Sequence, residues 1–214
     1  QKLSMGNPTT VALSRRQWWQ FVAAVALVVG VVGIDQWIKI WVKTDFYLHE
    51  SRRITDWIYL VLTENNGMAF GMEVFNKYFL TSFRIVAVCV LGNIIVRCIR
   101  KGTSWGFLTC LALVMAGAMG NIFDCLFYGF IFNNPPAPLT AEFVAWGTGY
   151  GELFLGRVVD MFYFPLVSWD WPLWMPMVGG QHFIFFSPIF NFADAAISCG
   201  MIAMLLCYRH KLQQ

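Results

Sequence analysis

Four apolar stretches constrain the fold of this chain more than any other feature. They cover about residues 18–41, 78–97, 104–124 and 188–208. Each approaches the roughly 20 residues that an α-helix needs to cross the hydrocarbon of a bilayer. Hydrophobic residues make up 58% of the 214 residues and charged residues only 13%, against about 45–50% and about 25% in ordinary globular proteins. The sequence therefore predicts an all-α polytopic membrane protein with four transmembrane helices.

The basic residues near these stretches predict their orientation. They form three clusters, before the first stretch, between the second and third, and after the fourth: Arg15 and Arg16; Arg97, Arg100 and Lys101; Arg209 and Lys211. Because loops rich in lysine and arginine stay in the cytoplasm, both termini are predicted to be cytoplasmic. The net charge of +3 is small, and no basic stripe or recognition motif indicates a nucleic-acid partner.

The same pattern divides the chain into a polar N-terminal tail (1–17), one membrane-embedded domain (18–208) and a cytoplasmic tail (209–214). Two segments, about 43–77 and 125–187, are predicted to be extracytoplasmic. In the first, residues 54–71 are rich in strand-forming residues and end in an Asn-Asn-Gly turn signal, which predicts a small antiparallel sheet at the membrane surface. The second is rich in proline and glycine and predicts a long irregular loop, whose Trp169, Trp171 and Trp174 suit an interfacial aromatic belt.

Two aspartates lie where a membrane protein least accommodates a charge. Asp160 lies in GRVVDMFYFP, a segment expected to re-enter the membrane surface, and Asp194 lies just inside the fourth stretch. A charged side chain costs roughly 2.5–3.5 kcal/mol at a helix centre, so both are candidate functional residues. Two adjacent carboxyls cannot both ionise easily, and a shared proton makes one an acid and the other a base. This pair predicts an aspartic protease; capping or paired structural carboxylates are the alternative.

Polar residues in two further motifs are candidates for supporting roles. In DQWIK, Asp35 and Lys39 are four residues apart on a helix and can pair. We expect structural support from this pair, as an ion pair at the interface with Lys39 reaching outward, and direct participation in the chemistry is the alternative. In NNGMAF, Gly67 permits a tight turn and Asn65 offers hydrogen bonds to a peptide backbone, although an ordinary surface turn explains them equally well.

Two other motifs lie at the predicted outer ends of the third and fourth helices. In AGAMGNIFD, the small residues Gly117, Ala118 and Gly120 allow another helix, or alternatively a substrate backbone, to approach closely, and helix packing is the expected role of the glycines. Asn121 and Asp124 are expected at the exit of that helix, Asn121 with an orienting role. In FNFAD, Asn191 can cap the fourth helix or form a hydrogen bond with a carboxyl. There is no HExxH motif, and no metal or cofactor is predicted from the three scattered histidines, His49, His182 and His210.

The ordered set DQxxK, NxGxAF, GNxxD, VVD and FNxAD, over roughly residues 18–208, resembles the bacterial lipoprotein signal peptidase (signal peptidase II) family. The resemblance implies that Asp160 and Asp194 form a catalytic dyad. It implies removal of the signal peptide from prolipoproteins before their diacylglyceryl-modified cysteine, at the extracytoplasmic face of the bacterial cytoplasmic (inner) membrane. Membrane lipids and globomycin-type cyclic peptide inhibitors are further expected partners. The residues that match the family motifs are Asp35, Lys39, Asn65, Gly67, Asn121, Asp124 and Asn191.

The chain departs from this family at three places. Cys125 follows Asp124 where family members usually have arginine, and Arg157 is the candidate to supply that positive charge. Met68 replaces a small residue, and the segment 125–159 is longer than the family's short link. These features are typical of a divergent branch.

Two other function classes remain open from the residues alone. Intramembrane carboxylates also mark proton-coupled transporters, although no inverted repeat is visible and the polar residues gather at one face. A non-catalytic membrane scaffold is the second alternative, and it predicts that both aspartates tolerate asparagine.

Overall fold

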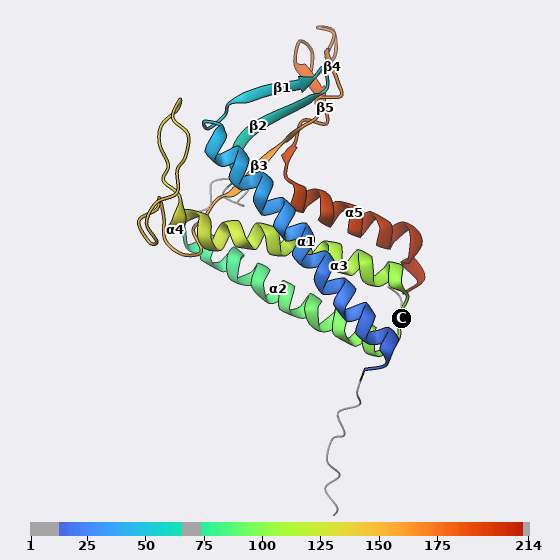
Figure 1. Ribbon diagram of the computed structural model, residues 1–214. Helices are drawn as coiled ribbons and strands as arrows, with labels where there is room; N and C mark the ends of the chain where they lie inside the picture. The colour runs from blue at the N-terminus through green and yellow to red at the C-terminus, as the bar shows by residue number, and fades with distance from the viewer. Residues whose placement is uncertain (1–12, 66–73, 212–214) are drawn as a thin grey trace, which may run out of the picture.

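The structure, a computed structural model, describes residues 13–65 and 74–211 and consists of a helical bundle with strands at one end (Figure 1). The main helices are α1 (Arg15–Asp45), α2 (Val74–Arg100), α3 (Trp105–Phe123) and α5 (Phe192–Cys207). Three helical segments, Arg15–Asp45, Lys77–Arg100 and Trp105–Ile131, are long and apolar enough to cross a membrane, and α5 is apolar but has only 16 residues. The bundle agrees with a polytopic membrane protein, whereas the fourth span, the side of the termini and the all-α class remain predictions.

Helix α3 lies at the centre of the bundle and packs against α1, α2 and α5. Its small residues make this close packing possible. A Cβ atom at Gly117 would overlap the backbone carbonyl of Ala193 on α5, and one at Gly120 would lie 2.6 Å from the Asp35 carboxylate on α1. The predicted close approach at these two glycines is confirmed, and it brings the start of α5 against the outer half of α3.

The sequence predicted that the third helical segment ends at Asp124, but in the structure it is longer. It continues as a π-helix, η1 (Asp124–Tyr128), and a final turn, α4 (Gly129–Ile131). The apolar and aromatic residues that follow Asp124 explain the difference, because Cys125 and Tyr128 are buried and extend the packed surface. Asp124 therefore lies inside the helical segment and is fully buried. Single π-turns of this kind occur frequently at functional sites.

The main sheet has four antiparallel strands in the order β1-β2-β3-β6. They are β1 (Ser51–Thr55), β2 (Ile58–Asn65), β3 (Val158–Tyr163) and β6 (Ile189–Phe190). The strand predicted in the first outer segment is thus confirmed. The irregular loop predicted for the second of these segments is confirmed for residues 132–157, which belong to no named helix or strand, but the rest of the segment supplies β3, β4 (Val167–Asp170) and β5 (His182–Phe185). The VVDMFY segment is a strand rather than a re-entrant segment, because its β-branched and aromatic residues favour pleated structure.

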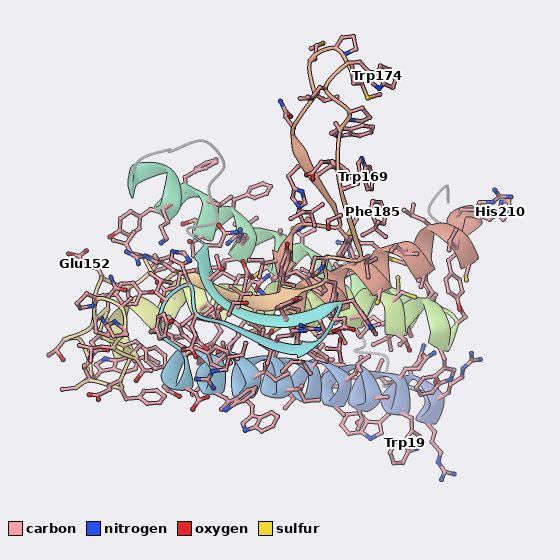
Figure 2. The ribbon with its side chains drawn as sticks, turned by 90° about the horizontal axis from the view of Figure 1, so that it is seen from above. Trp19, Glu152, Trp169, Trp174, Phe185 and His210 are labelled. Carbon is pink, nitrogen blue, oxygen red and sulfur yellow. The ribbon has the colours of Figure 1, made fainter. Side chains whose placement is uncertain are left out.

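Strands β4 and β5 form a separate hairpin that projects from the body of the protein. Figure 2 shows Trp174 at its far end and Trp169 and Phe185 nearer the body. Trp174 is 79% exposed and Met177 is 95% exposed. A location of this hairpin in the aromatic belt of a membrane remains a prediction.

A buried cluster joins the sheet to the C-terminal end of α1 and to the segment that continues α3. Its residues lie in or directly next to α1, β2, η1, α4 and β3: Val42, Phe46, Leu62, Tyr128, Phe132, Val159 and Met161. Successive side chains of a strand point to opposite faces. Because Val159 and Met161 are fully buried in this cluster, Asp160 between them is presented on the other face of β3.

Candidate active site

Asp160 is held at the middle of β3, where Thr63 of β2 is its partner across the sheet. Its residue exposure is only 5%. Nδ2 of Asn191 donates a hydrogen bond of 2.6 Å to Oδ1 of Asp160. The carboxyl of Asp160 therefore faces the residue that begins α5.

Asp194 lies in the first turn of α5, and Asn191 caps that helix. Oδ1 of Asn191 accepts a hydrogen bond of 2.9 Å from the backbone N–H of Asp194. The Asp194 carboxylate accepts one from the backbone N–H of Asn191 and one, of 2.8 Å, from Nδ2 of Asn121. The sequence offered Asn191 two roles, as a helix cap or as a partner of a carboxyl, and in the structure it has both. One asparagine thus connects Asp160 and Asp194.

Burial shifts the proton equilibrium of Asp160. Loss of hydration and, after it, the nearby charge of Asp194 raise the pKa of its carboxyl to about 7, although the hydrogen bond from Asn191 acts in the opposite direction. An uncharged carboxyl is favoured in such surroundings because a buried charge is poorly solvated. At neutral pH, Asp160 therefore retains its proton in a large fraction of molecules.

Lys39 organises the polar groups behind the two aspartates. Its side chain is fully buried, so the predicted ion pair is present but the outward position that was expected for Lys39 is wrong. Its Nζ lies 2.9 Å from Asp35 and 2.7 Å from Asp124. It also donates to Oδ1 of Asn121 at 2.9 Å. Because Lys39 occupies the side-chain oxygen of Asn121, the amide N–H groups of Asn121 are turned toward Asp194.

The two carboxylates paired with Lys39 also hold the backbone next to each candidate catalytic residue. Oδ1 of Asp35 accepts a hydrogen bond of 2.9 Å from the N–H of Ala193, which precedes Asp194. Oδ2 of Asp124 accepts one of 3.3 Å from the N–H of Val159, which precedes Asp160. The three-residue ion cluster Asp35–Lys39–Asp124 therefore positions the start of α5 relative to β3.

The comparisons with known proteins identify the family of this chain. A family model described as signal peptidase (SPase) II matches residues 27–209. The chain belongs to the signal peptidase II family. It is similar to the lipoprotein signal peptidase of Porphyromonas gingivalis, with 46% identity over 197 residues that cover 92% of this chain and 86% of the relative. The lipoprotein signal peptidase of Amoebophilus asiaticus is 33% identical over 209 residues, which cover 92% of this chain and 80% of the relative.

The fold is shared with a solved bacterial membrane enzyme. Its TM-score is 0.58 and its sequence identity is 20%, and the match covers 86% of this chain and 90% of the solved one. At that identity the likeness concerns the fold. The signal peptidase II family implies a protease.

Sequence analysis missed two residues that complete the site of this signal peptidase II family member. Nε2 of Gln36 donates to Oδ1 of Asp124 at 2.7 Å and to the carbonyl of Gly120 at 3.1 Å. The hydroxyl of Tyr128 donates to Oε1 of Gln36 at 3.0 Å. Gln36 follows Asp35 in the DQWIK motif, and a polar residue at that point of an apolar helix was the available signal. Tyr128 had none, because its position depends on the π-turn.

The remaining sequence candidates are Asn65, Gly67 and Arg157. Asn65 is an exposed residue at the end of β2, opposite Val158 in the sheet. Gly67 lies outside the described residues. Arg157 pairs with Glu64 at 3.0 Å and its guanidinium lies over the ring of Tyr150. Its contacts among the described residues thus place it with Glu64 and not at either aspartate.

Two charged residues that the sequence analysis did not single out, Arg84 and Glu64, contact residues near the candidate site. Nη1 of Arg84 donates to Sγ of Cys125 at 3.3 Å, so the guanidinium at this position comes from α2. Glu64 also pairs with Lys43. Burial raises the pKa of Glu64, but the positive charges of Lys43 and Arg157 outweigh it and hold the pKa below its usual value. Within residues 13–65 and 74–211, no group of three or more histidines, cysteines and acids is arranged to hold a metal ion.

Proposed function

We propose that this chain is an intramembrane aspartic endopeptidase that removes the signal peptide from diacylglyceryl-modified prolipoproteins, cutting before the lipidated cysteine. The observation that carries the proposal is the side chain of Asn191, which contacts Asp160 and the first turn that bears Asp194. Two carboxyls held by one asparagine, one of them with a pKa of about 7, provide an acid and a base at the same pH. The relatives named lipoprotein signal peptidase support the substrate.

In the proposed mechanism, Asp160 holds the proton and Asp194 is ionised. Asp194 takes a proton from water as the water oxygen bonds to the scissile carbonyl carbon. Asp160 donates its proton to the carbonyl oxygen, and the tetrahedral intermediate forms without a free charge on that oxygen. When it collapses, the C–N bond breaks, the proton on Asp194 passes to the leaving amine, and Asp160 regains its proton from the hydroxyl. General acid–base groups of this kind contribute about 10²–10⁴-fold each.

The sheet offers a position for the substrate backbone. Strand β6 pairs only with Phe162 and Tyr163, so in the described part of the chain the residues of β3 around Asp160 have a strand neighbour on the β2 side alone. An extended peptide that adds to this edge would present its backbone carbonyls beside Asp160. The lipid-linked substrate would reach the site by lateral diffusion at the extracytoplasmic face of the cytoplasmic membrane. This requires α5 to be the fourth span and both termini to be cytoplasmic.

The proposal is tested with single substitutions of each aspartate. Asp160→Asn and Asp194→Asn are purified in detergent and given a lipidated precursor, and cleavage is followed by the mobility shift of the product. Asp45→Asn is the matched control, because Asp45 is about half exposed and pairs with Arg52 at the surface.

The expected result is a loss of at least about 10²-fold in turnover for each site variant and none for the control. Wild-type turnover in either site variant, at normal helical content, contradicts the assignment. The scaffold alternative instead predicts that the purified wild-type protein does not cleave the precursor. Globomycin-type cyclic peptides are expected to inhibit the wild-type enzyme in the same assay.

A further inference from the structure

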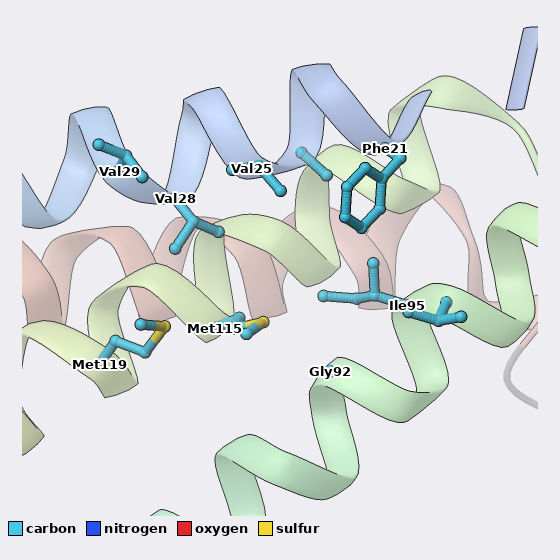
Figure 3. Close-up of a pocket in the computed structure, with 10 residues that line it drawn as sticks. Phe21, Val25, Val28, Val29, Gly92, Ile95, Met115 and Met119 are labelled. Atoms are coloured by element: carbon cyan, nitrogen blue, oxygen red, sulfur yellow. The ribbon is translucent and has the colours of Figure 1, made fainter. Parts of the chain in front are cut away.

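An apolar groove runs along one side of α2, between it and α3. A pocket of about 410 Å³ lies between α1, α2 and α3, and Figure 3 shows Ile95, Gly92, Met115 and Met119 lining it. A second pocket of about 280 Å³ lies between α2 and α3 farther toward η1, and Met119 lines it too. All residues that line the two pockets are apolar. Because they share Met119, the two pockets form one groove.

The length of the groove matches one leaflet of a bilayer. On α3 and its continuation it extends from Met115 to Phe127. Twelve residues of helix rise on the order of 18 Å. The hydrocarbon core of a bilayer is about 30 Å thick, so the groove spans little more than half of it. Its dimension along the bundle suits the acyl chain of a single lipid.

The outer end of this groove is basic. Lys77, Thr81 and Arg84 precede Val88 and Gly92 on the same face of α2, with the spacing of three and four residues that aligns side chains on a helix. Lys77 donates to the carbonyl of Leu155 and Thr81 to that of Phe154, so these two are packed against the loop before β3. The side chains on this face of α2 are therefore polar up to Arg84 and apolar from Val88 onward.

Arg84 has a neutral partner. Its guanidinium donates to Sγ of Cys125, and sulfur is a weak acceptor. Among the described residues, no carboxylate forms an ion pair with Arg84. Lys77 lies within electrostatic reach of Arg84, Arg157 and Glu64. Glu64, the carboxylate among these neighbours, is already paired with Arg157 and with Lys43.

We propose that this groove is a binding site for an anionic phospholipid of the membrane, with the phosphate at Arg84 and one acyl chain along Gly92 and Met119. Arg84, which forms no ion pair among the described residues, favours this occupant over the acyl chains of the proposed substrate, because a diacylglyceryl group carries no phosphate and offers a guanidinium no charged partner. Arginine is well suited to phosphate oxygens because its planar donors can bind two of them at once. The inference does not depend on the proposed peptidase activity.

Native mass spectrometry of the purified full chain tests the proposal. The protein in detergent is offered phosphatidylglycerol, phosphatidylcholine, or a neutral diacylated lipopeptide, and retained lipid is counted. Wild type is expected to retain phosphatidylglycerol in preference. A charge near anionic lipid contributes about 1 kcal/mol, which is about a fivefold change in this preference. Arg84→Gln is expected to lose that factor, and Arg84→Lys to keep most of it.

Two variants complete the design. Arg97→Gln removes the same charge from an exposed position near the other end of α2 and is expected to leave the preference unchanged. Gly92→Leu adds a side chain to the pocket, where a Cβ meets only Met115 at 3.6 Å, and is expected to reduce retention of both phospholipids. Equal preference in Arg84→Gln and Arg97→Gln overturns the proposal. So does wild-type retention by Gly92→Leu, or equal retention of the neutral lipopeptide and phosphatidylglycerol by wild type.

Discussion

The substitution Asp160→Asn is expected to make the protein more stable at alkaline pH while it abolishes cleavage. The pKa of Asp160 is about 7 in the folded protein and 3.8 in the ordinary reference state. An acid with a raised folded-state pKa favours the native state below pH 3.8 and loses that contribution as the pH rises through 7. A difference of about three pH units, at 1.36 kcal/mol each, gives on the order of 4 kcal/mol as an upper bound. Asparagine carries no charge and does not incur this cost.

The measurement is the midpoint of thermal unfolding in detergent, followed by circular dichroism between about pH 5 and pH 9. The gain of Asp160→Asn over wild type is expected to be small at the acidic end and to grow with pH until about 7. Asp56→Asn is the control, because Asp56 is highly exposed in the turn between β1 and β2. A difference between Asp160→Asn and wild type that stays the same at every pH would refute the reasoning.

Three further substitutions test the groups around the site. Lys39→Met leaves the buried carboxylates of Asp35 and Asp124 without their cation and is expected to lower the free energy of unfolding by about 3–5 kcal/mol. The effect on turnover per folded molecule is expected to be smaller than this effect on stability, and an unchanged midpoint of thermal unfolding would contradict the prediction. Gly120→Ala places a Cβ 2.6 Å from the Asp35 carboxylate and is expected to cost about 1–3 kcal/mol, whereas Gly33→Ala, with nothing within 4 Å, is the harmless control in the same unfolding assay. Because the pKa of Glu64 is lowered, its contribution to stability is present at neutral pH and is lost as the pH falls through the folded-state value; Glu64→Gln should therefore lower the unfolding midpoint at neutral pH and differ little from wild type in acid.

The membrane-spanning helices and the first strands could be predicted from the sequence because their signals are local. Runs of apolar residues define helices that must satisfy their own backbone hydrogen bonds in a bilayer, and the pattern near Ile58 is that of a strand. The continuation of α3 past Asp124 had no such signal. A π-turn depends on the packing of Tyr128 and Cys125 against other elements, which a single stretch of sequence does not contain.

The sequence identified most of the residues of the candidate site, but it did not predict which of them contact one another. Motifs identified Asp35 and Lys39 as a pair, but the outward position considered for Lys39 is wrong because Asp124 and Asn121, from α3 and η1, supply further partners. Asp160 lies on strand β3, and its neighbours Val159 and Met161 are buried on the opposite face. The sequence analysis identified Asp160 but not this strand. Gln36 and Arg84 were missed because their partners are distant in the sequence.

The pH dependence of cleavage by the wild-type enzyme tests the central claim most directly. If Asp160 supplies the proton and Asp194 accepts one from water, the specificity constant must fall above a pH of about 7, because Asp160 then loses its proton. The predicted profile declines by about tenfold per pH unit on its alkaline side. A rate that stays constant from pH 6 to pH 9, roughly the range over which the shared proton would be lost, would contradict a mechanism in which two aspartates divide one proton.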